Sequence, residues 1–424
     1  MQTTRKVKVH NLVSAQRIAS IILGIALAVG SPAAVQAGPS YLRGSWSTDL
    51  YGYDNGKSSR WDPYLNLRLN FTKPIGQTSR FWGVRLDSRI RYFRDNAETN
   101  ISMKNYDANF TLGNVIRNST ITIGQQFVYN TLRSSHLYGA RVQYSLARKV
   151  RLDAFGGNEQ WYYDIDKSYD PTYHVWGTRI SGDLTSTTQI GANWMLRRTG
   201  GREVYHRAGL DLTQQFGKSE LYGRGAWNLI NNRIVDLLGR FTTTPKDWYV
   251  SGEVNWREPN IDANSIFSVI AHDPFTRARF EVRHRLTRQL WIYKAAHATF
   301  EKGATIWQGT LGITGSGFSL GWSHQEGRGT KSDGLTGYMA ADLDQNWTVF
   351  GNSNLSRYRV QGEQVDLSDA YAASAGIGWR PGSGWQIQVQ GQWLRNAVRT
   401  SDVRLFLQLS KSFSATFGGN GASK

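Results

Sequence analysis

A strict alternation of apolar and polar residues runs through most of this sequence and limits its fold more than any other feature. In residues 385–393, every odd position is apolar or glycine and every even position is glutamine. A helix, with 3.6 residues per turn, cannot gather such a set on one face, whereas a strand does so directly. The same alternation recurs in residues 65–71, 82–92, 138–146 and 277–286. The sequence therefore predicts an all-β chain whose strands each have one dry and one wet face.

The first residues are predicted to be an export signal rather than part of the fold. Four cations, Arg5, Lys6, Lys8 and Arg17, precede an apolar run at residues 18–29, and residues 35–37 offer small side chains for cleavage. We therefore predict a secretory signal peptide at residues 1–37 and export through the Sec pathway. No later stretch approaches the roughly 20 apolar residues that a spanning helix requires. The chain has no cysteine, which excludes disulfides, thiolate metal sites and covalent haem attachment.

Aromatic residues on the apolar faces indicate what those faces contact. Three pairs, Trp248 and Trp256, Tyr371 and Trp379, and Trp385 and Trp393, are each separated by eight residues. Eight residues of a strand tilted by about 40° climb roughly 20 Å, close to the spacing of two aromatic girdles around a lipid-facing band. The core of a soluble β-sandwich also holds tryptophans, but it gives no reason for this interval to recur. The pattern predicts that the apolar faces meet lipid.

The connections between strands alternate in length. The segments number about 22, with 20 as the nearest alternative. Every second connection is short, as at Leu146–Lys149 and Arg380–Ser383, and the others are longer and more polar, as at Asn158–Tyr173. Bacterial transmembrane barrels have short periplasmic turns and long outer loops. We predict a single transmembrane antiparallel β-barrel at residues 38–413, without a plug domain, followed by a periplasmic tail at residues 414–424.

On these residues, the chain resembles the Gram-negative outer-membrane β-barrel class, and porins in particular. The resemblance covers nearly all of residues 38–413 and includes a closing strand with an apolar face made by Val403, Leu405, Leu407, Leu409 and Phe413. It departs from the class at Lys411, which interrupts that face, and in the glycine-rich tail. The resemblance implies a multi-pass position in the outer membrane, in contact with its lipid and with lipopolysaccharide.

Rows of arginine on the wet faces are the candidate functional residues. The formal net charge is +18, of which the leader contributes four cations and no acid. An exported barrel meets no chromosome, so we expect no nucleic-acid partner despite this charge. The arginines either contact an anionic solute or acidic partner, or form a ladder neutralised by Asp87, Asp211, Glu253 and Glu281. The rows comprise Arg85, Arg89, Arg91, Arg141, Arg277, Arg279, Arg283 and Arg285.

The predicted width of the barrel raises the question of what fills it. Barrels of 16–18 strands already hold an aqueous channel, and 22-stranded transporters are plugged. The loop Glu258–Phe275 contains an apolar stretch that can fold inward, but one such loop hardly closes this lumen. We favour the interpretation that the chain resembles the barrel of porin-cytochrome conduits. Such a barrel is a sheath for electron transfer across the outer membrane. The resemblance implies multihaem c-type cytochromes, periplasmic and extracellular, as partners, with haem bound only by them. The alternative is a general or anion-preferring porin.

Catalysis and metal binding have little support in the sequence. Only Ser135–His136 and His272–Asp273 pair residues typical of hydrolases, and adjacent residues of a strand point to opposite faces. His284 and His297 lie on neighbouring predicted strands, but two histidines alone do not make a metal site. We expect no enzymatic activity, no bound metal and no cofactor of the chain's own.

Overall fold

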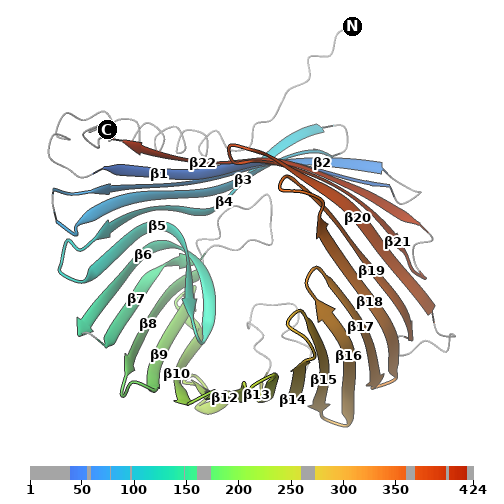
Figure 1. Ribbon diagram of the computed structural model, residues 1–424. Coiled ribbons are helices and arrows are strands. Elements are labelled where there is room, and N and C mark those ends of the chain that lie inside the picture. Colours follow the sequence, from blue (N-terminus) through green and yellow to red (C-terminus); the bar gives the residue numbers. More distant parts are fainter. Residues whose placement is uncertain are drawn as a thin grey trace, which may run out of the picture.

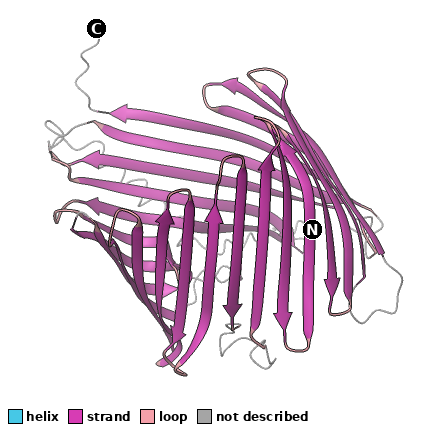
Figure 2. Ribbon diagram, turned by 60° about the horizontal axis from the view of Figure 1, so that its bottom comes forward, coloured by secondary structure: helices cyan, strands magenta, loops and turns pink. Residues whose placement is uncertain are grey.

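The computed structural model describes residues 39–54, 59–76, 78–95, 98–147, 149–159, 173–258, 273–359, 368–397 and 401–417, with side chains omitted at 93–100. These residues form 22 strands and no helix (Figure 2). No described helix is therefore long and apolar enough to cross a bilayer. The strands are β1 (Ser40–Asp54), β2 (Ser59–Pro74), β3 (Phe81–Asp95), β4 (Glu98–Gly113), β5 (Ser119–Asn130), β6 (Arg133–Ala147), β7 (Val150–Glu159), β8 (Tyr173–Asp183), β9 (Thr188–Thr199), β10 (Arg202–Phe216), β11 (Ser219–Asn228), β12 (Arg233–Thr243), β13 (Trp248–Arg257), β14 (Phe275–Arg285), β15 (Leu290–Glu301), β16 (Ala304–Gly315), β17 (Phe318–Gly327), β18 (Thr330–Asp342), β19 (Trp347–Arg359), β20 (Ser368–Gly382), β21 (Trp385–Arg395) and β22 (Asp402–Phe417).

The strands form one closed antiparallel barrel (Figure 1). Each strand pairs with its neighbour in sequence, and β1 pairs with β22 along its whole length, from Ser40 opposite Phe417 to Asp54 opposite Val403. The predicted fold class and the count of 22 strands are confirmed. The last strand ends at Phe417 and not at Phe413, so the first residues of the predicted tail belong to the wall.

The outward face of the barrel is apolar and open to its surroundings. Leu210 is 61% exposed, Ile123 53% and Phe280 51%. Exposed apolar residues that recur around a whole barrel are unfavourable in water and are expected where the wall meets lipid. Aromatic contacts lie near the turns on this face, with ring centroids of Trp46 and Trp385 5.5 Å apart and those of Trp347 and Trp379 5.6 Å apart.

Lys411, which interrupts the apolar face of the closing strand, lies among these aromatic rings. It is opposite Trp46 on one side and Trp385 on the other. Its ammonium group is 4.7 Å from the centroid of the Trp385 ring. A long cationic side chain in an aromatic girdle can keep its stem in the apolar layer and its charge at the interface. The departure from the pattern is therefore compatible with the lipid-facing wall.

One part of the sheet leaves the wall. β5 pairs with β4 only from Thr120 to Gln125, and β6 pairs with β7 only from Leu137 onward. β5 and β6 nevertheless stay paired with each other to the tip, where Asn130 is opposite Arg133. Residues 126–136, here called the inner hairpin, therefore pair with neither β4 nor β7. They bend into the barrel over β7–β10 (Figure 1).

Glycine permits this bend on both legs of the hairpin. Gly124 has a φ of +121°, and a Cβ there would lie 2.4 Å from the carbonyl oxygen of Ala108. On the other leg, a Cβ on Gly139 would lie 2.1 Å from the carbonyl oxygen of Gly156. Only glycine fits such a conformation and such an approach between backbones. The bend is thus specified locally by the sequence.

Candidate functional site

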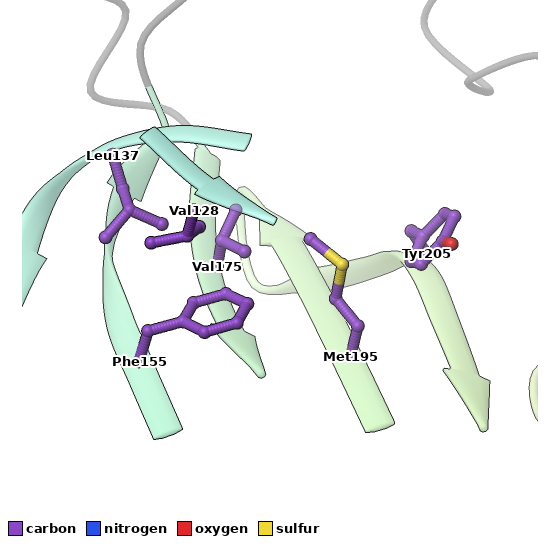
Figure 3. Close-up of a cluster of buried hydrophobic side chains, with 6 residues drawn as sticks. All are labelled: Val128, Leu137, Phe155, Val175, Met195 and Tyr205. Carbon is purple, nitrogen blue, oxygen red and sulfur yellow. The ribbon is translucent and has the colours of Figure 1, made fainter. Parts of the chain in front are cut away.

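The inner hairpin packs on an apolar patch of the lumenal wall. Phe155, Val175, Met195 and Tyr205 lie on the face of β7–β10 that also carries Asp153, Arg179, Asn193 and Asp211, which is the wet face elsewhere. All four are buried, and Val128 and Leu137 of β5 and β6 complete the cluster at 0% exposure (Figure 3). Full burial of such a side chain contributes about 1.5–3 kcal/mol. The lumen therefore contains a dry contact between the hairpin and the wall.

Polar groups hold the tip of the inner hairpin in place. Arg179 donates to Thr131 Oγ1 over 3.2 Å and also forms two bonds of 2.8 Å with the carboxylate of Asp211. The hydroxyl of Tyr205 donates to the carbonyl oxygen of Leu132 over 3.0 Å. The side-chain amide of Asn130 donates to two backbone carbonyls of β8 and β9. Together, these hydrogen bonds join the tip of the hairpin to three strands of the wall, β8, β9 and β10, and fix its position there.

A buried ion pair supports the returning leg of the hairpin. Ser135 Oγ donates to Glu159 Oε1 over 3.0 Å, and Glu159 forms an ion pair with Arg197. Arg197 is fully buried, and its guanidinium lies 3.8 Å from the centre of the Tyr173 ring. A charge withdrawn from water is tolerated only when it is paired. Removing Glu159 is therefore expected to release this leg.

The predicted arginines of β3 and β6 lie on the lumenal face, and most contact acids. Arg85 pairs with Asp107 at 3.2 Å, and Arg91 pairs with Asp62 at the same distance. The structure brings Arg141 to Asp153, with one bond of 2.9 Å. Arg89 is different: its Nε donates to Asn66 Oδ1 over 2.7 Å, and no ion pair joins it to an acid among the described residues.

The arginines of β14 form a row around one acid. Arg279 and Arg283 both contact Glu281, at 2.8 and 2.5 Å. Arg277 lies 5.5 Å from the centre of the Phe275 ring. Arg285, at the end of the strand, pairs with Asp247 in the turn before β13, and this hydrogen bond lowers the pKa of the Asp247 carboxyl. Glu281 and Asp247 thus offset part of the charge of the row.

Of the four acids expected to neutralise the ladder, only Glu281 contacts arginines of the predicted rows, while Asp87 and Asp211 pair with other lumenal arginines. Asp87 pairs with Arg68 at 2.9 Å, Asp211 with Arg179, and Glu281 with the β14 row. Glu253 lies opposite Arg240 and Arg279 in the sheet.

The inner hairpin is the lumenal element that sequence reasoning missed. The loop Glu258–Phe275 was the chief candidate for folding inward, but its residues 259–272 lie outside the described residues. Two signals pointed to the hairpin instead. The alternation fails at Phe127–Tyr129, where three apolar residues are consecutive, and apolar residues occupy the wet register at Phe155, Val175 and Met195.

The histidine pairings that the structure describes do not bring their side chains together into a chemical site. His284 faces outward, stacked on Trp248 with ring centroids 4.1 Å apart, whereas His297 lies opposite Arg279 on the lumenal face. Ser135 binds Glu159, while the His136 ring contacts Phe127. His272 lies outside the described residues. Within the described ranges, no group of three or more potential ligands could hold a metal ion.

Comparison with known proteins gives a likeness in fold alone. No protein-family model matches the chain, and no curated protein matches it. Among solved structures, the P pilus usher (PapC) translocation pore is similar with a TM-score of 0.47 and 9% identity, over 89% of this chain and 100% of that one. OccAB4 of Acinetobacter baumannii is similar with a TM-score of 0.41 and 7% identity, over 91% and 100% of the two chains. The outer membrane protein opdK of Pseudomonas aeruginosa has a TM-score of 0.40 and 10% identity, over 89% and 99%. Such values carry no information about what enters this barrel.

Proposed function

We propose that this protein is an outer-membrane channel through which small polar solutes diffuse, with a lumen narrowed by its own inner hairpin. The observation that carries the proposal is the dry contact between Val128, Leu137 and the lumenal wall of β7–β10. A chain that fills part of its own lumen with a fixed element regulates the size of what can pass. The surrounding wall is polar, as an aqueous path requires.

The charge of the lumen supports a preference for anions. The arginines of β14 outnumber the acid they surround, because Arg279 and Arg283 share Glu281. Arg277 adds a further cation without an ion pair to a described acid. Rings of positive side chains in a pore favour anions, and the preference weakens as salt screens them.

The conductance of a variant that lacks the inner hairpin tests the proposed channel directly. Replacing residues 126–136 by a short glycine-serine turn should increase single-channel conductance severalfold in a planar bilayer, because the hairpin no longer obstructs the lumen. A matched control shortens the turn at residues 185–187, which joins two strands of the wall without entering the lumen. An unchanged conductance after the hairpin deletion would show that the hairpin does not narrow the path.

The width of the barrel favours a second candidate, the sheath of a porin-cytochrome conduit. With 22 strands the wall is wider than that of channels with 16–18 strands, and it can surround another protein. The lumenal arginines would then contact acidic side chains or haem propionates of a multihaem cytochrome. The inner hairpin counts against this candidate, since it occupies part of the space that such a partner needs.

Purification from native outer membranes separates the two candidates. The tagged barrel is extracted in mild detergent, its visible absorption is recorded, and a gel is stained for haem. A Soret band with a co-purifying cytochrome would establish the sheath. A haem-free barrel with ohmic, anion-biased conductance would establish the channel and exclude the conduit.

A further inference from the structure

Arg89 stands apart from the other arginines of its strand. Arg85 and Arg91 each contact an acid, whereas Arg89 has only neutral partners among the described residues. Its guanidinium lies 5.5 Å from the ring centre of Tyr64 and 5.8 Å from that of Tyr106. The bond to Asn66 uses one of the five N–H donors of the guanidinium. The terminal nitrogens therefore keep donors for a ligand.

Arg89 lines a polar recess of about 700 Å³ in the lumenal wall of β22 and β1–β4. Most groups around it are hydroxyls, amides and acids, and those of β22 join the others only because the barrel is closed. The recess includes Ser47, Asp49, Asn66, Asp87, Gln408 and Ser410.

The acids of the recess already have donors. Asp49 accepts hydrogen bonds from Asn66 Nδ2 at 2.6 Å and from Gln408 Nε2 at 2.9 Å, one on each oxygen. Asp87 accepts from Arg68 Nε at 2.9 Å. These bonds satisfy the carboxylates within the wall, whereas the terminal N–H groups of Arg89 remain as charged donors. The recess carries two acids, Asp49 and Asp87, and two cations, Arg68 and Arg89, so an anion would be held by these directional donors and not by a net positive charge.

We propose that this recess is a binding subsite for small hydroxylated carboxylates. The proposal rests on the proposed function, since the ligand reaches the recess through the lumen. The planar fork of Arg89 matches a carboxylate in a bidentate geometry, with two parallel N–H···O bonds. Ser47, Ser410 and Gln408 offer hydrogen bonds to hydroxyl groups of the same solute. Tyr64 and Tyr106 confine the guanidinium and thereby limit the orientation of the ligand.

Gluconate is the probe, and sorbitol is its neutral counterpart with the same carbon chain. Binding is measured by isothermal titration calorimetry on the detergent-purified barrel. Arg89→Gln should weaken gluconate binding at least about tenfold, the scale of a charge-assisted hydrogen bond. Arg85→Gln is the matched control, because it removes the same charge from the same face of β3 at a residue that Asp107 already pairs. Arg89→Lys keeps the charge but loses the fork, and should give an intermediate affinity.

The outcomes separate this proposal from the channel itself. Equal heats for gluconate and sorbitol, or equal losses in Arg89→Gln and Arg85→Gln, would overturn the subsite even in a barrel that conducts ions. Gluconate binding that depends on Arg89, in a barrel without conductance, would support the subsite and overturn the channel. Folding of each variant is checked by the mobility shift of heated and unheated barrels on gels, and Arg89→Lys carries the test if Arg89→Gln does not fold.

Discussion

Arginine is buried on one side of the lumen and exposed to water on the other. On β7–β10, Arg197 is fully buried beneath the inner hairpin and is paired with Glu159. On β13–β16, Arg279 faces an open lumen with 58% of its side chain exposed, although it too contacts an acid. The first ion pair is part of a packed interior, whereas the second is a solvated charge. Water access, and not the presence of arginine, decides whether a lumenal charge is structural or available to solutes.

The comparison also shows where rigidity lies in the barrel. The packed side has an apolar cluster, directional hydrogen bonds and buried charges, and each of these resists displacement. The open side presents exposed charged side chains to the lumen. The barrel thus has a packed side and an open, charged side.

A charge placed in the dry contact should have the largest effect, because it should remove the packed side that distinguishes the two halves of the lumen. Val128→Asp buries an acid without a partner, which costs several kcal/mol, so the hairpin should leave the wall. Trypsin should then cut after Arg133, and mass spectrometry of the fragments detects the cut. Thr310→Asp is the control, since Thr310 lies on the lumenal face of the open side and its acid stays hydrated. Protection of Arg133 in Val128→Asp would argue against a dry contact.

A side chain at Gly139, where β6 passes close to β7, should have the next largest effect. Gly139→Val drives a Cβ against the carbonyl oxygen of Gly156, and overpacking of this kind costs about 1–3 kcal/mol. The temperature at which the barrel loses its compact mobility on gels should fall. Gly223→Val is the matched control, because no atom lies within 4 Å of a Cβ built there. Equal midpoints for the two variants would contradict the close approach of β6 and β7.

The smallest effect is expected when one acid is neutralised in a buried ion pair and, separately, one acid in an exposed ion pair. These two variants give the most direct comparison. Asp211→Asn removes the carboxylate that binds Arg179 beneath the hairpin tip, where Asp211 is 6% exposed, and should increase current fluctuations in bilayers. Asp247→Asn alters an exposed pair in a turn and should leave the current unchanged.

Acid provides a further check on the exposed pair. The pKa of Asp247 is lowered by Arg285, so its small contribution to stability is present above the ordinary carboxyl pKa of about 4 and is lost only as the pH falls through the lowered value. Thermal midpoints of wild type and Asp247→Asn should coincide below that range. If the two thermal midpoints still differ in strong acid, the pair affects stability by something other than charge.

The wall of the barrel could be predicted from the sequence because its determinants are local. Alternation such as that of Trp385–Trp393 fixes a strand and both of its faces, and the turns fix the order of pairing. The inner hairpin could not be placed in this way. Val128 and Leu137 would suit a lipid-facing position equally well, and only Val175 and Met195, far away in sequence, show that they face inward. The arginines could be assigned to the wet face, but their acidic partners lie on other strands, so their local charge could not be judged.

The seam between β1 and β22 determines when the barrel can finish folding. Gln408 and Asp49, which share a hydrogen bond across it, are 359 positions apart in the chain. Until the last strand is made, the edge of β1 has no partner and is open to pairing with other chains. Contacts between such distant segments form late and slowly, because the intervening chain must first be organised. The recess around Arg89, which draws on both strands of the seam, therefore comes into being only when assembly is complete.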